Sequence, residues 1–341
     1  MPAIVRLLAK RLATSLIVLI GVSILIFAIA RVIPGDPARI ALGPNATAAA
    51  VAALREKLHL NDGFLTQYGY FVADLFRGDL GISLYTNRPV TRDIAEFLPA
   101  TLELIFVSGI MMVALGLPLG VISARYRGTW IDHVIRLVTL LGVSAPGFVW
   151  AVILMLLFAY YIQLFPIAGR LSDGLGFQPI TGFLLFDTLV SGNVKAFGDA
   201  LWHVILPAFA LALSGIGQAA RLVRANMVET YTKPYIEMAE AYGFAASRIA
   251  NRYAFRPSLI PSLTIIGLDF AAMLGSAFLV ESVYAWPGLS KYGVAVILRK
   301  DLNAIVGTVL IISAMFLIVN ILVDLMVSVV NPRIRLSERP S

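Results

Sequence analysis

Long apolar stretches separated by clusters of charged residues dominate the pattern along this chain. Six stretches of 19 or more residues contain no lysine or arginine and at most one acidic residue, namely 12–30, 104–124, 137–169, 200–220, 257–280 and 302–332. A helix needs about 20 apolar residues to cross the hydrocarbon core of a bilayer, which is about 30 Å thick. The pattern therefore predicts six membrane-spanning helices, and the third stretch leaves room for an interfacial turn at Phe165 and Pro166.

Composition points to the same class of protein. Of the 341 residues, 59% are hydrophobic and 14% are charged, whereas soluble domains have about 45–50% apolar and about 25% charged residues. This balance excludes an ordinary soluble domain, and it is the opposite of what a disordered chain needs. The sequence has no cysteine, which excludes disulfides, thiolate metal sites and a cysteine nucleophile. We therefore expect an all-α polytopic membrane protein without a metal site.

The distribution of charge orients the predicted helices. With six spans, the two termini share one side of the bilayer with the second and fourth loops, and these segments hold 15 basic residues against five acidic ones. The opposite side holds 12 basic and 13 acidic residues. Because lysine and arginine are retained in cytoplasmic loops, both termini are predicted to be cytoplasmic. The net charge of +7 is thus explained by topology, and without a binding motif or interleaved aromatics we expect no nucleic-acid partner.

These boundaries predict four parts of the chain. They are a cytoplasmic N-terminus with the first span (1–33), an extracytoplasmic insert (34–97), a core with the remaining spans (98–330) and a cytoplasmic tail (331–341). The core contains an outer loop (166–203) and a cytoplasmic loop (227–257). The first span has a rival interpretation as a cleaved signal peptide, but its 19 uncharged residues exceed the usual apolar region of about 7–15.

The cytoplasmic loop 227–257 is too long for a simple helix connection, which takes about 2–8 residues. Pro234 suits the first turn of a helix and Gly243 suits its C-terminal cap. Between them, four residues at helical spacing predict one apolar face: Tyr235, Met238, Ala239 and Tyr242.

Two interpretations of this short helix follow from its residues. Arg248, Arg252 and Arg256 recur every four residues and form a basic stripe, which favours a helix lying on anionic lipid. Short amphipathic helices also dock in grooves of partner proteins. Periodicity alone leaves both open.

The same segment resembles the EAA motif of ATP-binding-cassette (ABC) importer permeases. The matching residues are Glu237-Met238-Ala239, Gly243 after three more residues, and then Leu259-Ile260-Pro261. In that family the helix inserts into the nucleotide-binding subunit and transmits ATP-driven motion to the spans. The resemblance implies that the contact to the ATPase is made by Tyr235, Glu237, Met238, Ala239, Glu240 and Gly243. Met238 departs from the motif, in which alanine occupies that position.

Further segments resemble the dipeptide/oligopeptide/nickel branch of these permeases. They are Ile33-Pro34-Gly35-Asp36-Pro37, Gly78-Asp79-Leu80-Gly81-Ile82-Ser83, Arg88-Pro89-Val90, Leu98-Pro99-Ala100-Thr101-Leu102-Glu103-Leu104, Glu281-Ser282-Val283-Tyr284-Ala285-Trp286-Pro287-Gly288-Leu289 and Asn331-Pro332-Arg333-Ile334-Arg335. Pro179-Ile180-Thr181-Gly182-Phe183 is similar to the dipeptide systems in particular, closest to their B-type permease subunit. These segments follow the family order over residues 33–335.

The resemblance implies the fold and the partners. We expect the type I importer permease fold in the bacterial cytoplasmic (inner) membrane, paired with a second homologous permease subunit. An extracytoplasmic substrate-binding protein would deliver the cargo. Two cytoplasmic ATP-binding subunits would hold ATP and Mg²⁺. The chain has no G-x-x-x-x-G-K-[ST] motif, so we expect neither a cofactor nor enzyme activity of its own.

Ionisable residues inside the predicted spans are candidate functional residues, because a charge at the bilayer centre costs at least about 2.5–3.5 kcal/mol. Asp269 lies midway along the fifth span and either attracts the amino group of a peptide in the translocation path or pairs with a subunit partner. Asp324, near the inner end of the sixth span, and His203 are predicted to be structural. Glycines at five positions are predicted to permit close helix packing: Gly109, Gly116, Gly120, Gly215 and Gly217.

The sequence also bears on other cargoes and on two other functions, an ion-coupled transporter and a membrane hydrolase. Nickel, glutathione, opine and haem importers share this permease pattern, and residues 179–183 favour short peptides. An ion-coupled secondary transporter is disfavoured because no internal repeat and only one acid well inside a span are present. A membrane hydrolase is disfavoured because the sequence lacks H-E-x-x-H and G-x-S-x-G motifs.

Overall fold

The computed structural model describes residues 2–32, 37–43, 45–57 and 59–330. Two predicted family segments, residues 33–36 and 331–335, and the predicted tail 331–341 lie outside the described residues. In the described part, the regular elements are α-helices with two π-helical turns: α1 (Pro2–Val32), α2 (Pro37–Leu42), α3 (Ala48–Lys57), α4 (Phe64–Phe76), α5 (Val90–Arg125), α6 (Trp130–Ser144), α7 (Gly147–Leu154), η1 (Met155–Tyr161), α8 (Leu184–Val190), α9 (Val194–Thr230), α10 (Pro234–Ala241), α11 (Ala246–Arg248), η2 (Ile249–Ala254), α12 (Phe255–Val283), α13 (Leu289–Leu298) and α14 (Leu302–Val330).

Five helices are long and apolar enough to cross a membrane, and a sixth crossing is divided. The five segments are Leu8–Ile29, Val90–Arg125, Val194–Thr230, Ala246–Val283 and Leu302–Ser328. The predicted third span consists of two helical segments, Trp130–Ser144 and Gly147–Tyr161, which meet at 105°. The all-α polytopic fold is thus confirmed, with the third span broken rather than continuous.

Proline explains the break in the third span. Pro146 lacks a backbone N–H, and its ring disfavours a helical conformation of the preceding residue. Ala145 accordingly adopts an extended backbone with φ −124° and ψ 148°. The chain therefore changes direction sharply at this point.

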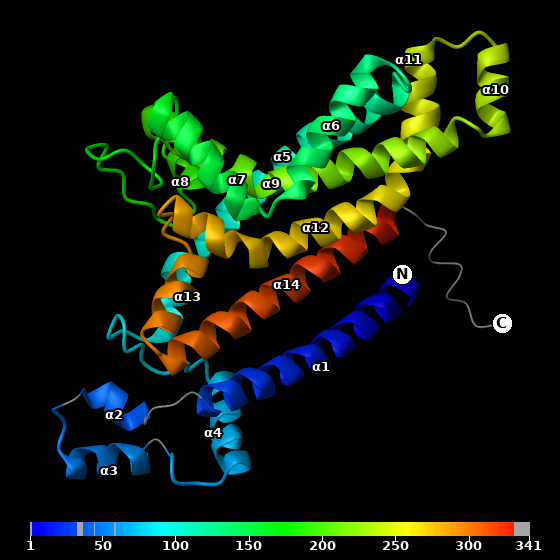
Figure 1. Cartoon of the computed structure of the whole chain (residues 1–341). Coiled ribbons are helices and arrows are strands. Elements are labelled where there is room, and N and C mark those ends of the chain that lie inside the picture. Colours follow the sequence, from blue (N-terminus) through cyan, green and yellow to red (C-terminus); the bar gives the residue numbers. More distant parts are fainter. Residues whose placement is uncertain (1, 33–36, 44, 58, 331–341) are drawn as a thin grey trace.

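The helices form a bundle in which α9 is central. It packs against α5, α12, α6 and α7, while α14 lies between α12 and α1 (Figure 1). The short helices α2, α3, α4 and α8 lie at one end of the bundle, and α10 projects from the other end, where α1 begins. This arrangement separates the sequence motifs into two groups, one at each end.

Close contacts of glycines with neighbouring helices hold α5, α6 and α9 together. A Cβ at Gly116 would lie 2.9 Å from the Cβ of Ala219, and one at Gly120 would lie 2.7 Å from the carbonyl oxygen of Ala220. Gly217 of α9 approaches the carbonyl oxygen of Thr139 in α6 equally closely. The predicted packing role of these glycines is therefore confirmed.

An ion pair joins the N-terminal part of α1 to the C-terminal part of α14. The guanidinium of Arg11 lies 2.8 Å from a carboxylate oxygen of Asp324. This contact supports the structural role predicted for Asp324. Otherwise α1 is weakly covered, because only 17% of its most apolar window is buried within the chain.

Candidate functional site

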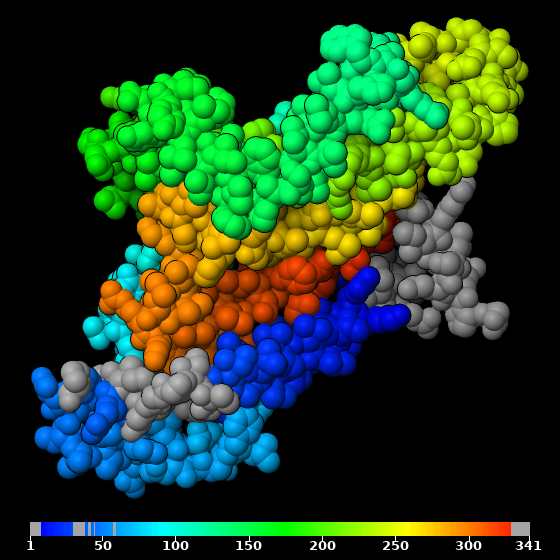
Figure 2. Space-filling view, in the orientation of Figure 1, coloured from blue at the N-terminus to red at the C-terminus, as the bar shows by residue number. Residues whose placement is uncertain are grey.

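The short helix α10 begins and ends where its sequence predicts. Pro234 occupies its first turn. At the other end, the N–H of Gly243 donates to the carbonyl of Glu240 at 2.8 Å, and the N–H of Phe244 donates to the carbonyl of Ala239 at 3.2 Å. Gly243 has a φ of +76°, a left-handed conformation that glycine adopts without strain. The chain therefore turns sharply here and leaves α10 exposed at the end of the molecule (Figure 2).

The apolar residues of α10 are divided between two sides. Ile236 and Ala239 are 1% and 4% exposed, and they pack against a cluster with Met227 and Ile249. The adjoining side exposes Tyr235, Met238 and Tyr242, at 40%, 56% and 76%. The four predicted residues lie within about 100° of one another on the helix, but the structure buries Ala239, and the sequence pattern missed Ile236, which is buried beside it. Glu237 and Glu240 are both exposed.

We call Tyr235, Met238 and the capping residue Tyr242 the contact face of α10, because they are its exposed large apolar side chains in the described chain. These positions recur at i, i+3 and i+7, so the three side chains project from one strip of the helix. Such spacing is how amphipathic helices anchor in a groove of a partner. Residues Arg248, Arg252 and Arg256 are also exposed, and Arg248 lies over the ring of Phe244 at 4.8 Å.

In the chain, α10 lies between two membrane-spanning helices, α9 and α12. Three residues, 231–233, join α9 to α10, and the chain then passes through α11 and η2 into α12. A force on α10 therefore acts on α9 and α12 first.

A buried ion pair joins α9 to α5 and α6 near the same end. Arg224 donates from Nε and from a terminal nitrogen to the two carboxylate oxygens of Asp132, at 2.7 and 2.8 Å. Asp132, at the start of α6, is 1% exposed and accepts a further bond from the Ser123 hydroxyl of α5 at 2.6 Å. Bidentate arginine–carboxylate pairs fix orientation as well as distance. The pair therefore links three helices next to α10.

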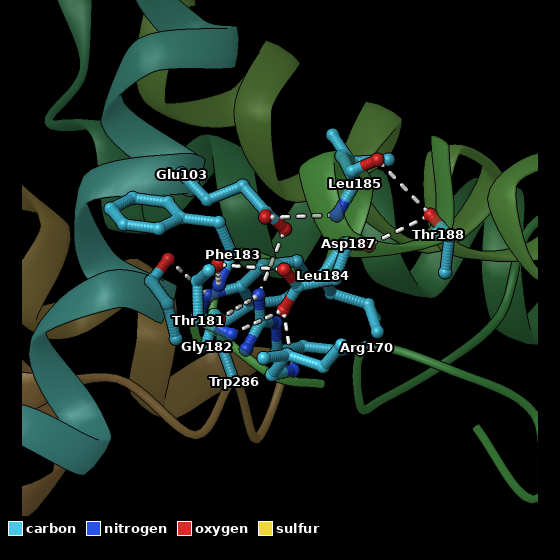
Figure 3. A network of polar contacts seen from close by, with 12 residues as sticks. Glu103, Arg170, Thr181, Gly182, Phe183, Leu184, Leu185, Asp187, Thr188 and Trp286 are labelled. Carbon is cyan, nitrogen blue, oxygen red and sulfur yellow. Dashed lines mark hydrogen bonds and ion pairs between the residues drawn. The ribbon is translucent and has the colours of Figure 1, made fainter. Parts of the chain in front are cut away.

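At the opposite end, a second network holds the outer loop on the bundle (Figure 3). Arg170 of the loop pairs with Glu103 of α5 at 2.9 Å and donates to the carbonyl of Gly182 at 3.1 Å. The second oxygen of Glu103 accepts from the N–H of Leu185 at 3.0 Å. The Arg170 guanidinium also lies 5.5 Å from the ring centre of Trp286. Arg170 and Glu103 are 12% and 6% exposed at their side chains, so the loop is fixed by a largely desolvated pair.

The segments that carry the family resemblance meet at this end. Thr101 donates to the carboxylate of Glu281 at 2.6 Å and accepts from the N–H of Leu289 at 2.7 Å. The indole N–H of Trp286 donates to the carbonyl of Ala100 at 2.9 Å. Residues separated by about 180 positions in the chain thus form one hydrogen-bonded unit.

Asp187 organises the turn that contains residues 179–183. Its carboxylate accepts from the N–H groups of Ile180 and Thr181 at 2.8 and 2.9 Å and from the Thr181 hydroxyl at 2.8 Å. Burial by itself raises the pKa of Asp187, but these hydrogen bonds to the charged form outweigh it, and the pKa lies below its ordinary value.

Asp269 lies within α12, away from both networks. One of its carboxylate oxygens is inaccessible to solvent and has no hydrogen-bond partner among the described residues. The next turn of the helix in each direction exposes Ile265 and Ala272, whereas Met273 is buried against α9. Asp269 therefore stands at the edge between a packed side and an open side of α12.

His203, in contrast, has local partners. Its Nδ1 lies 2.8 Å from the carbonyl oxygen of Asp199, one turn earlier in α9. No group of three or more potential metal ligands is found in the described part of the chain.

Sequence reasoning missed the charged residues of the two networks. Arg224 and Asp132 are separated by 92 positions, and Arg170 and Glu103 by 67. The sequence offered one signal for these four residues, which is their position at the edges of apolar stretches. Each is the first charged residue beyond a predicted span or lies within a few residues of that first charge. That signal marks a boundary but does not indicate a partner.

Two family models match the chain. One, described as a binding-protein-dependent transport system inner membrane component, matches residues 116–336. The other, described as the N-terminal part of a binding-protein-dependent transport system membrane component, matches residues 4–105.

Curated relatives match over nearly the full length. A probable D,D-dipeptide transport system permease protein of Escherichia coli K12 is 39% identical over 96% of this chain and 97% of its own length. Dipeptide transport system permease proteins of Escherichia coli K12 and Alkalihalophilus pseudofirmus are 36% and 35% identical, covering 97% and 96% of this chain and 98% of their own lengths.

Proposed function

The chain belongs to the family of binding-protein-dependent transport system inner membrane components, and on that premise we propose that it is a permease subunit through which short peptides cross the bacterial cytoplasmic membrane. The dipeptide relatives support the cargo, together with residues 179–183. The observation that carries the mechanism is the exposed contact face of α10, which is apolar and unpartnered in this chain.

The partners proposed here follow from the kind of system. Two cytoplasmic ATPases would bind the ATP and Mg²⁺, a second homologous permease would complete the path, and an extracytoplasmic binding protein would deliver the peptide. Both termini and α10 would be cytoplasmic, which the excess of 15 basic over five acidic residues supports. The side chains of Tyr235, Met238 and Tyr242 would enter a groove of the ATPase.

Motion of the ATPase would reach the spans along a short route. Displacement of α10 acts on α9 and α12, and the Asp132–Arg224 pair extends it from α9 to α5 and α6. Breaking such a buried pair by removing one partner costs about 3–5 kcal/mol. We therefore propose that these four helices move as one unit when α10 is displaced.

The substitution Gly243→Arg tests this coupling. At a φ of +76°, a residue with a Cβ costs roughly 1–2 kcal/mol, so arginine should displace the end of α10. We expect peptide uptake to fall at least about tenfold, the equivalent of roughly 1.4 kcal/mol, while ATP hydrolysis by the assembled complex continues. Uptake of a radiolabelled dipeptide and phosphate release, measured on the same proteoliposomes, report the two quantities.

Gly243→Asn is the matched control, because asparagine tolerates the left-handed conformation. It should retain most uptake, and a Cβ at this position meets no atom within 4 Å. Normal uptake by a fully assembled Gly243→Arg complex would contradict the coupling role of α10.

Asp269 is our candidate residue in the translocation path. A carboxylate oxygen without a partner, next to an open side of a spanning helix, is suited to attract the ammonium group of a peptide N-terminus. The alternative is a cation on a partner subunit. Asn at this position keeps the shape and removes the charge.

Transport kinetics of Asp269→Asn distinguish these roles. If the carboxylate meets the peptide, transport of a free dipeptide should slow several-fold, whereas an N-acetylated dipeptide should be transported equally by both proteins. Equal slowing of both cargoes would contradict recognition of the amino group. Loss of complex assembly in the variant would instead identify a subunit contact.

Whether the cargo is a peptide can be tested on the extracytoplasmic binding protein alone. The ligand that co-purifies with the cognate binding protein is expected to be a short peptide, and a nickel, glutathione, opine or haem ligand would overturn that part of the proposal. Uptake that survives ATP depletion but collapses with the ion gradient would overturn the ABC mechanism.

A further inference from the structure

The helix α4 belongs to the insert after the first span, yet it packs on the membrane-spanning part of α1. Phe27 of α1 lies between three aromatic rings of α4, with centroid distances of 5.4 Å to Phe64, 5.5 Å to Tyr68 and 5.3 Å to Phe71. The hydroxyls of Ser23 and Tyr68 are 2.8 Å apart. These contacts fix the position of α4 along α1, and therefore its depth relative to the apolar segment of α1.

That depth is within the outer part of the bilayer. The apolar segment of α1 ends at Ile29, so Ser23 lies about 9 Å before its end at 1.5 Å per residue. Interfacial helices bury their apolar side about 5–10 Å into the boundary between headgroups and acyl chains. With 13 residues, α4 is about 20 Å long, too short to cross, and Figure 1 shows it running across the end of α1 rather than along it.

The surface of α4 has three sectors. One, with Tyr68 and Phe71, packs on α1. At 100° per residue, a second sector holds only apolar or small side chains, and a third holds polar ones. The apolar flank is Leu65, Gly69, Val72, Ala73 and Phe76, and the polar flank is Thr66, Gln67, Tyr70, Asp74 and Arg77.

The two flanks have different surroundings. On the polar flank, Gln67 donates to the carbonyl of Asp62 at 2.7 Å, and Tyr70 stacks on His59 with ring centres 4.1 Å apart. The turn that precedes α4 thus contacts this flank at Gln67 and Tyr70. The apolar flank points away from that turn and is open, with Leu65 81% and Phe76 87% exposed.

We propose that α4 lies in the outer leaflet of the membrane, with its apolar flank among the acyl chains and its polar flank toward the headgroups. The occupant is lipid because α4 packs beside the apolar segment Leu8–Ile29 of α1, which itself exposes large apolar side chains such as Ile17 and Leu25, as a helix surrounded by acyl chains does. Two open flank residues as large as Leu65 and Phe76 are stable in acyl chains and unfavourable in water. Part of the insert 34–97 is therefore membrane-associated, which anchors the segments around α2 and α3 close to the bilayer.

Site-directed fluorescence tests the orientation of α4. The chain has no cysteine, so single cysteines can be placed without a background substitution. Two adjacent pairs compare the flanks: Leu65→Cys with Thr66→Cys, and Phe76→Cys with Arg77→Cys. Each full-length variant, assembled with its partner subunits, carries an environment-sensitive fluorophore in vesicles of phosphatidylethanolamine and phosphatidylglycerol.

Two quenchers then report what each label touches. Phosphatidylcholine with a doxyl group near the carboxyl end of its acyl chain should quench the Leu65 and Phe76 labels about twofold more than the Thr66 and Arg77 labels. Aqueous iodide should show the reverse order. Equal lipid quenching within each pair would overturn the proposal, and so would Leu65 and Phe76 labels shielded from both quenchers, because a protein partner would then cover the flank.

Discussion

Single carboxylates determine the structure of the end of the bundle that carries α8. Asp187, Glu103 and Glu281 are all buried, and each accepts hydrogen bonds from a segment distant in the sequence or from a turn. Buried charges are stable only when their hydrogen-bonding capacity is met. Each of these residues therefore constrains the backbone that donates to it.

The outer turn should consequently open in acid. Because the pKa of Asp187 is lower in the folded protein than its ordinary value, the charged form stabilises the turn. This stabilisation is complete above the unfolded pKa of about 3.9 and is lost as the pH falls through the folded value. We expect the exchange protection of the Ile180 and Thr181 amides, corrected for intrinsic rates, to fall below about pH 4.

The Asp187→Asn variant provides the control for this pH dependence. Its amide protection should already be lower at neutral pH and should not decrease further in acid. A wild-type-like acid transition in that variant would assign the effect to another group.

At the scale of elements, helix packing depends on glycines, because the absence of a side chain lets two helices approach closely. A Cβ at Gly217 would collide with the backbone of Thr139, whereas a Cβ at Gly275 meets nothing within 4 Å. Gly217→Ala should therefore cost about 1–3 kcal/mol through overpacking. Gly275→Ala should be neutral or stabilising by up to about 1 kcal/mol through helix propensity. Thermal unfolding of the two purified variants in the same detergent checks the contrast, and equal midpoints would contradict it.

The sequence predicted elements better than it predicted their contacts. Apolar stretches placed the spans, and Pro234 and Gly243 placed the ends of α10, because these signals are local. The 105° break in the third span was not predictable, since proline in a membrane helix permits anything from a slight kink to a reversal. The burial of Ile236 depends on α9 and η2, and a helix wheel contains no information about neighbours.

The same limit applies to the candidate site. Single residues could be predicted from the sequence, whereas the networks they form could not. The family resemblance pointed to Glu237, Met238 and Gly243, all of which lie on or beside the projecting helix. Arg170 and Arg224 each combine with a carboxylate many residues away. Neither ion pair has a characteristic spacing in the sequence, so only the three-dimensional fold identifies it.

At the scale of the whole molecule, the two ends of the bundle have different kinds of surface. The end that carries α8 is closed by buried polar contacts between α5, the loop that contains Arg170 and the segment after α12. The opposite end carries α10, held by Ile236 and Ala239 and otherwise exposed. If α10 is displaced as proposed, the motion enters a bundle whose other end is held by these buried contacts.

The exposed strip of α10 also bears on the fate of copies that never find a partner. Tyr235, Met238 and Tyr242 stand clear of the fold, next to arginines 248, 252 and 256. Contiguous apolar side chains exposed to water mark interaction sites and are also an aggregation liability. If α10 docks as proposed, a subunit without its partner would keep this strip in water and would be more prone to aggregate than the assembled one.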